Sequence, residues 1–167
     1  HIINSIDFAT TGNATDFGDL TDGIRRARAG MSSRTRAVVA GISDGGSSKN
    51  SSNIMEFVTI NSAGNSTDFG DATVARQVSQ GLANRTRGIN GGGSSSGTNT
   101  ETNVIDYITI ATTGNAADFG DLSAVRNPCG GGASPTRGIF AAGQQANNSG
   151  SNIIEFITIA STGNVTD

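Results

Sequence analysis

The sequence has no tryptophan, and histidine, cysteine and lysine occur once each. With His1 as the only histidine, Ser-His-Asp or Cys-His catalysis lacks its general base. Cys129 cannot form an intrachain disulfide and has no base beside it in sequence to activate its thiol. Because Lys49 is the only lysine and the net charge is −3, we expect no nucleic-acid partner. No apolar run has transmembrane length, so we expect no membrane insertion.

Glycine, by contrast, is abundant, with 24 residues, and it marks a repeat. Four turn glycines, each followed by asparagine, are separated by 52, 50 and 49 residues; they are Gly12, Gly64, Gly114 and Gly163. This period is in the range of four-stranded propeller blades. We divide the chain into a partial unit 1–24, units 25–75 and 76–125, and a partial unit 126–167. Both ends fall inside a unit, so we expect a piece of a longer array with open edges.

Each unit has the sequence pattern of four short strands. An apolar, β-branched run at 54–60, 104–110 and 153–159 predicts a strand covered on both faces, and residues 2–8 form a more polar copy. The Gly-Asn turn and the D-F-G-D segment after it predict a hairpin. A weak small-residue strand and a Gly/Ala-rich strand precede the apolar run. The fold class is therefore all-β, with four-stranded antiparallel repeats and no long helix.

The order of these features resembles kelch-type β-propeller repeats. Gly91-Gly92 stands where that family has its diglycine, and residues 54–60 stand at its third strand. The resemblance implies inter-blade arginines at Arg25, Arg76 and Arg126. It also implies inter-blade core residues at Phe17, Phe69 and Phe119, where the family usually has tryptophan. Two units depart from the pattern, because the diglycine is Ala40-Gly41 in one and Ala141-Ala142 in the other.

The wording I-E-F-I-T-I-A-S-T-G-N with T-D-F-G-D-L is also similar to repeats in tail-associated or fibre proteins of marine bacteriophages. The resemblance implies a non-enzymatic structural or adhesion protein of the virion, within an oligomeric assembly, with other virion proteins or host-surface glycans and proteins as partners. One alternative is an extracellular adhesin on a bacterial or archaeal surface. A sugar-active propeller enzyme is a further alternative, which would need histidine or additional carboxylates from elsewhere.

The D-F-G-D segment is the first candidate for chemistry. A kinase metal site is excluded because the lysine strand and catalytic loop that it requires are missing. A Ca²⁺ site at the paired carboxylates is a candidate, but two acids in one turn are few ligands. We favour a structural ladder in which these acids pair with arginines of each unit, and we expect no cofactor. The acids are Asp16, Asp19, Asp68, Asp71, Asp118 and Asp121, and the second set of arginines is Arg36, Arg87 and Arg137.

Three polar loops vary in length and sequence while their surroundings repeat. They span 43–52, 94–102 and 144–151, beginning at Ser43, Ser94 and Gln144 and ending at Ser52, Thr102 and Ser151. Repeated positions are constrained by packing, so recognition can vary where the units differ. We therefore predict that partner contacts map to these loops.

Overall fold

The computed structural model describes residues 2–21, 29–40, 51–95, 100–145 and 148–167. These residues form antiparallel sheets, and no α-helix occurs among them. The three predicted apolar strands are confirmed as β5 (Ser52–Thr59), β11 (Val104–Thr109) and β15 (Gly150–Thr158). The all-β prediction is thus confirmed, and its physical basis is the β-branched and aromatic content of these strand-length runs.

The described residues form five sheets, of which the four larger units along the chain are named sheets I to IV. Sheet I pairs β1 (Ile2–Ser5) with β2 (Thr15–Asp19). Sheet II has the order β3 (Ala29–Ser32), β4 (Arg36–Ala40), β5 and β6 (Thr67–Arg76). Sheet III has the order β7 (Gln80–Ala83), β8 (Arg87–Gly91), β11 and β12 (Ala117–Asp121). Sheet IV has the order β13 (Gly130–Ala133), β14 (Arg137–Gln144) and β15.

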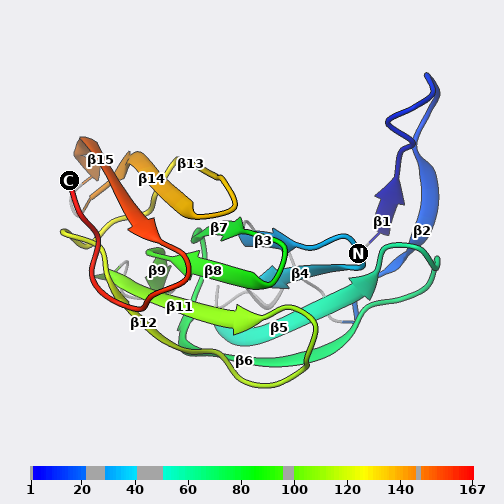
Figure 1. Ribbon diagram of the computed structural model, residues 1–167, viewed down its shortest axis with the longest axis horizontal. Coiled ribbons are helices and arrows are strands. Elements are labelled where there is room, and N and C mark those ends of the chain that lie inside the picture. Colours follow the sequence, from blue (N-terminus) through cyan, green and yellow to red (C-terminus); the bar gives the residue numbers. More distant parts are fainter. Residues whose placement is uncertain (1, 22–28, 41–50, 96–99, 146–147) are drawn as a thin grey trace.

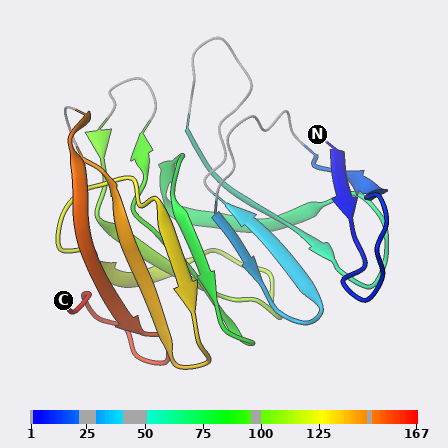
Figure 2. The same ribbon diagram turned by 90° about the horizontal axis from the view of Figure 1, so that it is seen from above.

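The sheets are arranged in an open arc, with sheet I at one end and sheet IV at the other (Figure 1). The first strands β3, β7 and β13 lie next to one another on the inner side. The last strands β2, β6 and β12 lie on the outer side (Figures 1 and 2). Every complete unit therefore runs from the inner to the outer side of the arc before the chain passes to the next sheet.

The inner strands contain glycines at the positions where they approach their neighbours closely. A Cβ placed on Gly81 of β7 would lie 2.4 Å from the carbonyl oxygen of Gly30 in β3. A Cβ on Gly131 of β13 would lie 2.8 Å from the Leu82 side chain. The Gly/Ala-rich strands that follow are also crowded, since a Cβ on Gly91 would lie 2.6 Å from the Phe140 ring. Between the first strands β3 and β7, backbone lies directly against backbone, at Gly30 and Gly81.

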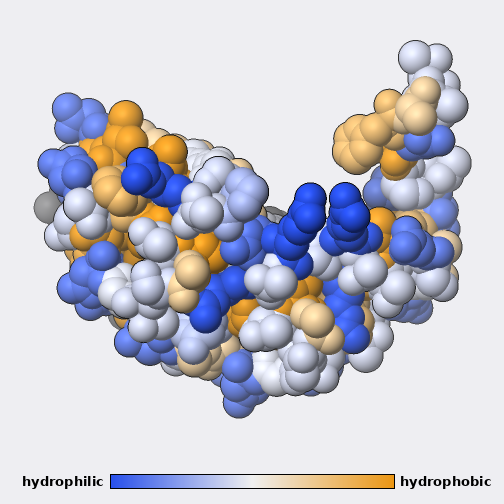
Figure 3. All heavy atoms as spheres, in the orientation of Figure 1, coloured by the Kyte–Doolittle hydropathy of each residue, from blue (hydrophilic) through white to orange (hydrophobic). Residues whose placement is uncertain are grey.

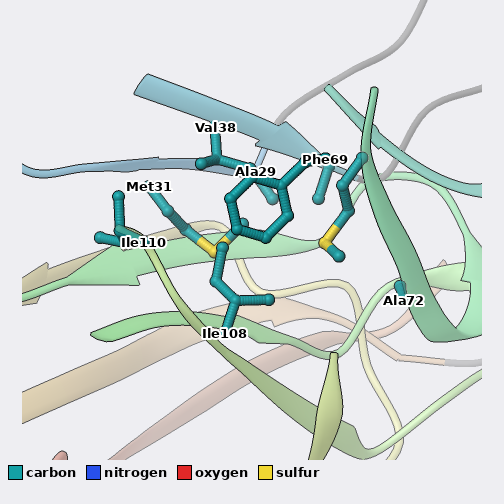
Figure 4. Close-up of a cluster of buried hydrophobic side chains, with 9 residues drawn as sticks. Ala29, Met31, Val38, Phe69, Ala72, Ile108 and Ile110 are labelled. Atoms are coloured by element: carbon teal, nitrogen blue, oxygen red, sulfur yellow. The ribbon is translucent and has the colours of Figure 1, made fainter. Parts of the chain in front are cut away.

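Two apolar clusters fill the spaces between consecutive sheets. The first lies between sheets II and III and contains Met31, Val38 and Phe69 together with Ile108 and Ile110 (Figure 4). The second lies between sheets III and IV and contains Leu82, Ile89, Phe119, Ile157 and Ile159 among others. Repeat-equivalent residues thus build both clusters, so the sheets are packed by one recurring interface.

A backbone contact repeats along the outer side of the arc. The Gly-Asn turn of each sheet docks on the D-F-G-D strand of the sheet before it. The turn N–H groups donate to Phe carbonyls, from Gly64 to Phe17, Gly114 to Phe69 and Gly163 to Phe119, each at 2.7 Å. The turn Asn side chain accepts from the last Asp N–H, at 3.0 Å for Asn115 and Asp71. The turn that the sequence predicts to reverse the chain therefore also joins neighbouring sheets.

The D-F-G-D glycine is required by this docking. Gly70 has φ +132°, and a Cβ on it would lie 2.5 Å from the carbonyl carbon of Gly114. Gly18 and Gly120 meet Gly64 and Gly163 in the same way. We expect Gly70→Ala to lower the free energy of unfolding by about 3 kcal/mol, from overpacking and backbone strain together. Urea unfolding measures this, with Gly12→Ala as the control, because no atom lies within 4 Å of a Cβ on Gly12. Equal stability of the two variants would contradict the docking.

The aromatic residue of D-F-G-D differs in burial between units. Phe69 and Phe119 are 2% exposed, whereas Phe17 in sheet I is only half-buried. Phe69 and Phe119 also make edge contacts with Phe57 and Tyr107. We predict that Phe69→Ala lowers the free energy of unfolding by about 3–5 kcal/mol, and that Phe17→Ala lowers it by clearly less. A loss below about 1 kcal/mol for Phe69→Ala, measured by urea unfolding, would contradict a core role.

Candidate functional site

The link between consecutive sheets contains a buried arginine. Arg76 follows the D-F-G-D segment of sheet II, is 1% exposed, and forms an ion pair with Asp106 in β11 of sheet III. Its guanidinium also donates to the backbone carbonyls of Val104 at 2.8 Å and Asn90 at 3.0 Å. Arg126 repeats the arrangement with Glu155 in β15. Each arginine thus ties the end of one sheet to the middle of the next.

The acid partner sits at a bulge in the third strand. The pairing register shifts between Met55 and Glu56, and again between Ile105 and Asp106. A bulge re-aims a side chain locally, and these carboxylates are directed at the preceding sheet. There they also meet a hydroxyl residue two positions after D-F-G-D: Thr73 bonds to Asp106, and the Ser123 N–H donates to Glu155 at 3.2 Å.

Glu56 accepts the equivalent bonds from the preceding unit. The Thr21 N–H and hydroxyl both donate to its carboxylate, and Ser66 donates at 2.6 Å. Arg25, expected to be the inter-blade arginine of this unit, lies outside the described residues. The contacts of Glu56 nonetheless place its carboxylate in the same role as Asp106 and Glu155.

The ladder that we expected from D-F-G-D is therefore built differently. Arg76 pairs with the third-strand acid Asp106 and not with Asp68 or Asp71. The D-F-G-D acids contribute through their backbone, since the carbonyl of Asp71 accepts from Ala116 at 2.8 Å. Within the described residues no group of three or more His, Cys, Asp or Glu could hold a metal ion. The two-carboxylate Ca²⁺ candidate therefore gains no further acidic ligand there.

The second arginine set bridges sheets by its side chain. Arg36 stacks on Phe57, with 4.6 Å from its guanidinium carbon to the ring centroid, and donates to the carbonyls of Ile110 at 3.2 Å and Ala111 at 2.9 Å in the next sheet. Arg87 stacks on Tyr107 at 4.4 Å and donates to Ile159 at 2.7 Å. Arg137 stacks on Phe156 at 4.3 Å. A planar guanidinium suits this combination of ring stacking and carbonyl binding.

The described bases of the expected recognition loops lie at one edge of the sheets, where the second strand of each unit ends (Figure 2). Most of the loop 43–52 lies outside the described residues, as do 96–99 and 146–147. The described bases are polar; one is the short hairpin of β9 (Ser94–Ser95) and β10 (Thr100–Glu101). At the opposite edge, the turns between first and second strands line a groove of about 260 Å³ that includes Arg34 and Arg85.

The loop bases are fixed to the same links that hold the buried arginines. Gln77, next to Arg76, exchanges two backbone hydrogen bonds of 2.9 Å with Ser94 at the start of a loop. Asn127, next to Arg126, exchanges bonds of 2.8 and 3.1 Å with Gln144. Gly93 and Gly143 have positive φ at this bend, and a Cβ on Gly143 would lie 2.4 Å from the Asn127 carbonyl oxygen. The loop position therefore depends on the arginine link.

Sequence reasoning missed the acid partners and the loop anchors. Glu56, Asp106 and Glu155 recur at one repeat position, and Thr21, Thr73 and Ser123 recur two residues after D-F-G-D. An acid inside an otherwise apolar strand is the signal that could have identified a buried ion pair. Gln77 and Asn127 carry a weaker signal, because both are amide residues directly after the arginine.

No family model matches the chain, and no curated protein matches it. Among the described residues, no helix is long and apolar enough to cross a membrane. Cys129 is exposed and free. The polar arrangements that recur in the described part of the chain are the arginine links, the arginine bridges and the loop edge.

Burial perturbs the acid–base properties of the first link. It raises the pKa of the Asp106 carboxyl, against the opposing effects of the Arg76 charge and the Thr73 hydrogen bond, and it lowers the pKa of Arg76. Neither partner is stable as a charge in this environment without the other, since removing one member of a buried pair leaves an uncompensated charge.

We predict that Arg76→Met lowers the free energy of unfolding at neutral pH by about 3–5 kcal/mol. Losing the arginine raises the folded-state pKa of Asp106 further above its ordinary value of 3.8. The folded state then binds the proton more tightly than the unfolded state, so the variant is most stable below that value and loses stability as the pH rises through the folded pKa. Urea unfolding as a function of pH measures both effects.

The matched control is Arg34→Met, because Arg34 is exposed in a turn and should change stability little. Adding Asp106→Leu to Arg76→Met should recover part of the loss and remove its pH dependence, since no unpaired carboxylate remains. If Arg76→Met alone had the same pH dependence of unfolding as the wild type, the pairing of Arg76 with Asp106 would be contradicted.

Proposed function

We propose that the chain is a non-enzymatic scaffold of kelch-like β-propeller blades that presents variable loops on one edge, in a structural or adhesion protein of a phage tail or fibre. The observation that carries the proposal is the division between a repeated framework and a varied edge. Arginine links, turn docking and apolar clusters recur between sheets, while the loops attached to them differ in every unit. Such a division suits a protein whose fold is constant and whose contacts are specific.

Several features support the blade reading. The complete units are four-stranded antiparallel sheets whose strands pair in sequence order. Their first strands lie together on the inner side of an arc, as blades are arranged around an axis. The linking arginine occupies the position that the kelch resemblance implies, and it bonds to the following sheet. The proposal of a phage protein is based on the amino-acid sequence of the repeat.

The composition of the loop edge favours a glycan or a wet protein interface. Its described residues are mainly Ser, Thr, Gln, Asn and Glu, including Thr100, Glu101 and Asn148. Such residues supply hydrogen bonds, but they lack the aromatic anchors that dominate tight protein interfaces. We infer that affinity comes from several loops acting together on a host-surface polysaccharide or another virion protein.

We predict that replacing all three loops with short Gly-Ser turns, with Ser94 and Gln144 retained as anchors, abolishes binding to an array of bacterial surface polysaccharides. The urea midpoint should stay close to that of the wild type, because the sheet interfaces are unchanged. A control variant with Arg34→Ser and Arg85→Ser alters the opposite edge and should bind normally. Binding that survives loop replacement, or that is lost in this control, would refute the assignment of the loop edge.

A further inference from the structure

The turns between the first and second strands of sheets II, III and IV meet in one groove. They span residues 33–36, 84–87 and 134–137, and in each the first N–H donates to the last carbonyl, at 2.9, 3.0 and 2.8 Å. The three turns lie side by side at the edge opposite the loops (Figure 2). The groove between them has a volume of about 260 Å³. It is therefore shared by three consecutive sheets.

The turns are held by the side chain at their first position. Asn84 accepts from the N–H groups of Thr86 at 2.9 Å and Arg87 at 2.8 Å. Ser33 accepts from the two equivalent N–H groups of its own turn, both at 3.2 Å. The Asn84 amide also donates to the carbonyl of Pro135 in the next turn at 3.0 Å. Side-chain capping and this cross-link hold the turns in a fixed arrangement.

Two exposed arginines stand at the same position of neighbouring turns. Arg34 and Arg85 each follow the capping residue, and both line the groove. The other arginines of the described chain form the buried ion pairs or stack on aromatic rings. Among the described residues, Arg34 and Arg85 are therefore the arginines whose side chains have no partner within the protein, and both lie in one groove.

The groove is basic although the chain is acidic. The net charge of the chain is −3, yet none of the described residues that line the groove is acidic. Its other lining residues are hydroxyl, amide and small apolar residues, among them Asn84, Ala83 and Pro135. Figure 3, which views the edge that carries these turns, shows strongly hydrophilic side chains there. Two unpaired guanidinium groups without an acid beside them attract an anionic ligand.

The size and lining of the groove favour carboxylates on a polypeptide. A guanidinium binds a carboxylate by two parallel hydrogen bonds. A nucleic acid needs more cations than two, and the single-stranded form also needs aromatic side chains for stacking, of which the described lining has none. The volume of about 260 Å³ is below the range of roughly 300–1,000 Å³ for small-molecule pockets. A short stretch of extended chain fits such a space.

We propose that this groove binds a short acidic segment of a partner protein, with one carboxylate on Arg34 and another on Arg85. The two arginines are one repeat apart on sheets whose first strands touch at Gly30 and Gly81, so they present two carboxylate sites at a fixed spacing. The groove is at the edge opposite the loops. The chain can therefore hold a partner protein at one edge while its loops bind at the other, whatever those loops recognise.

The probe is a fluorescein-labelled hexaglutamate peptide, with hexaglutamine as its uncharged counterpart, and fluorescence anisotropy measures its binding to the chain. We expect saturable binding of hexaglutamate below about 1 mM and none of hexaglutamine. Arg85→Gln should weaken binding by about tenfold, because a charge-assisted contact is lost. Arg85→Lys should also bind more weakly than the wild type, since lysine keeps the charge but not the planar fork. Urea unfolding checks that both variants keep the stability of the wild type.

Arg137→Gln is the matched control, because it removes one charge at the same edge, but the Arg137 guanidinium stacks on Phe156 and does not line the groove. It should bind hexaglutamate as the wild type does. An equal loss in Arg137→Gln and Arg85→Gln, or an unchanged affinity in Arg85→Lys, would mean attraction by charge alone. Either result overturns the proposal, as does tighter binding of a hexathymidylate or an oligogalacturonate, or no binding of hexaglutamate.

The double variant with Arg34→Ser and Arg85→Ser separates this proposal from that of the loop edge. It should lose hexaglutamate binding and keep polysaccharide binding, whereas replacement of the three loops should have the opposite effect. Hexaglutamate binding that survives in the double variant would overturn the assignment of the groove and leave that of the loops unaffected.

Discussion

The buried arginine between consecutive sheets is the interaction on which the arrangement depends. The Arg76 guanidinium cannot remain inside the protein without an anion and carbonyl acceptors, and its partners among the described residues belong to the following sheet. The guanidinium can therefore form these bonds only when the following sheet is packed in one register and at one distance. Because Gln77 holds the base of the next loop, the same constraint also fixes where that loop leaves the framework.

Glycine sets the distance between sheets at two other places. Gly81 faces the Gly30 backbone on the inner side of the arc, and Gly70 faces the Gly114 backbone on the outer side. Backbone contact at both sides leaves side-chain volume only in the middle, where the apolar clusters lie. From the sequence alone, the many glycines indicate turns and loops. In the structure, some of them are needed because neighbouring sheets pack backbone against backbone.

The strands could be predicted because they depend on local sequence. The site could not be predicted because its ion pairs join residues of different units. The apolar runs predicted β5, β11 and β15 within about two to three residues, because the strand preference of β-branched and aromatic residues is local. The partner of Arg76 was assigned to D-F-G-D, which is near in sequence, whereas the true partner Asp106 is in the next unit. Spacing within one unit cannot reveal a contact between units, although an acid in an apolar strand was a usable sign.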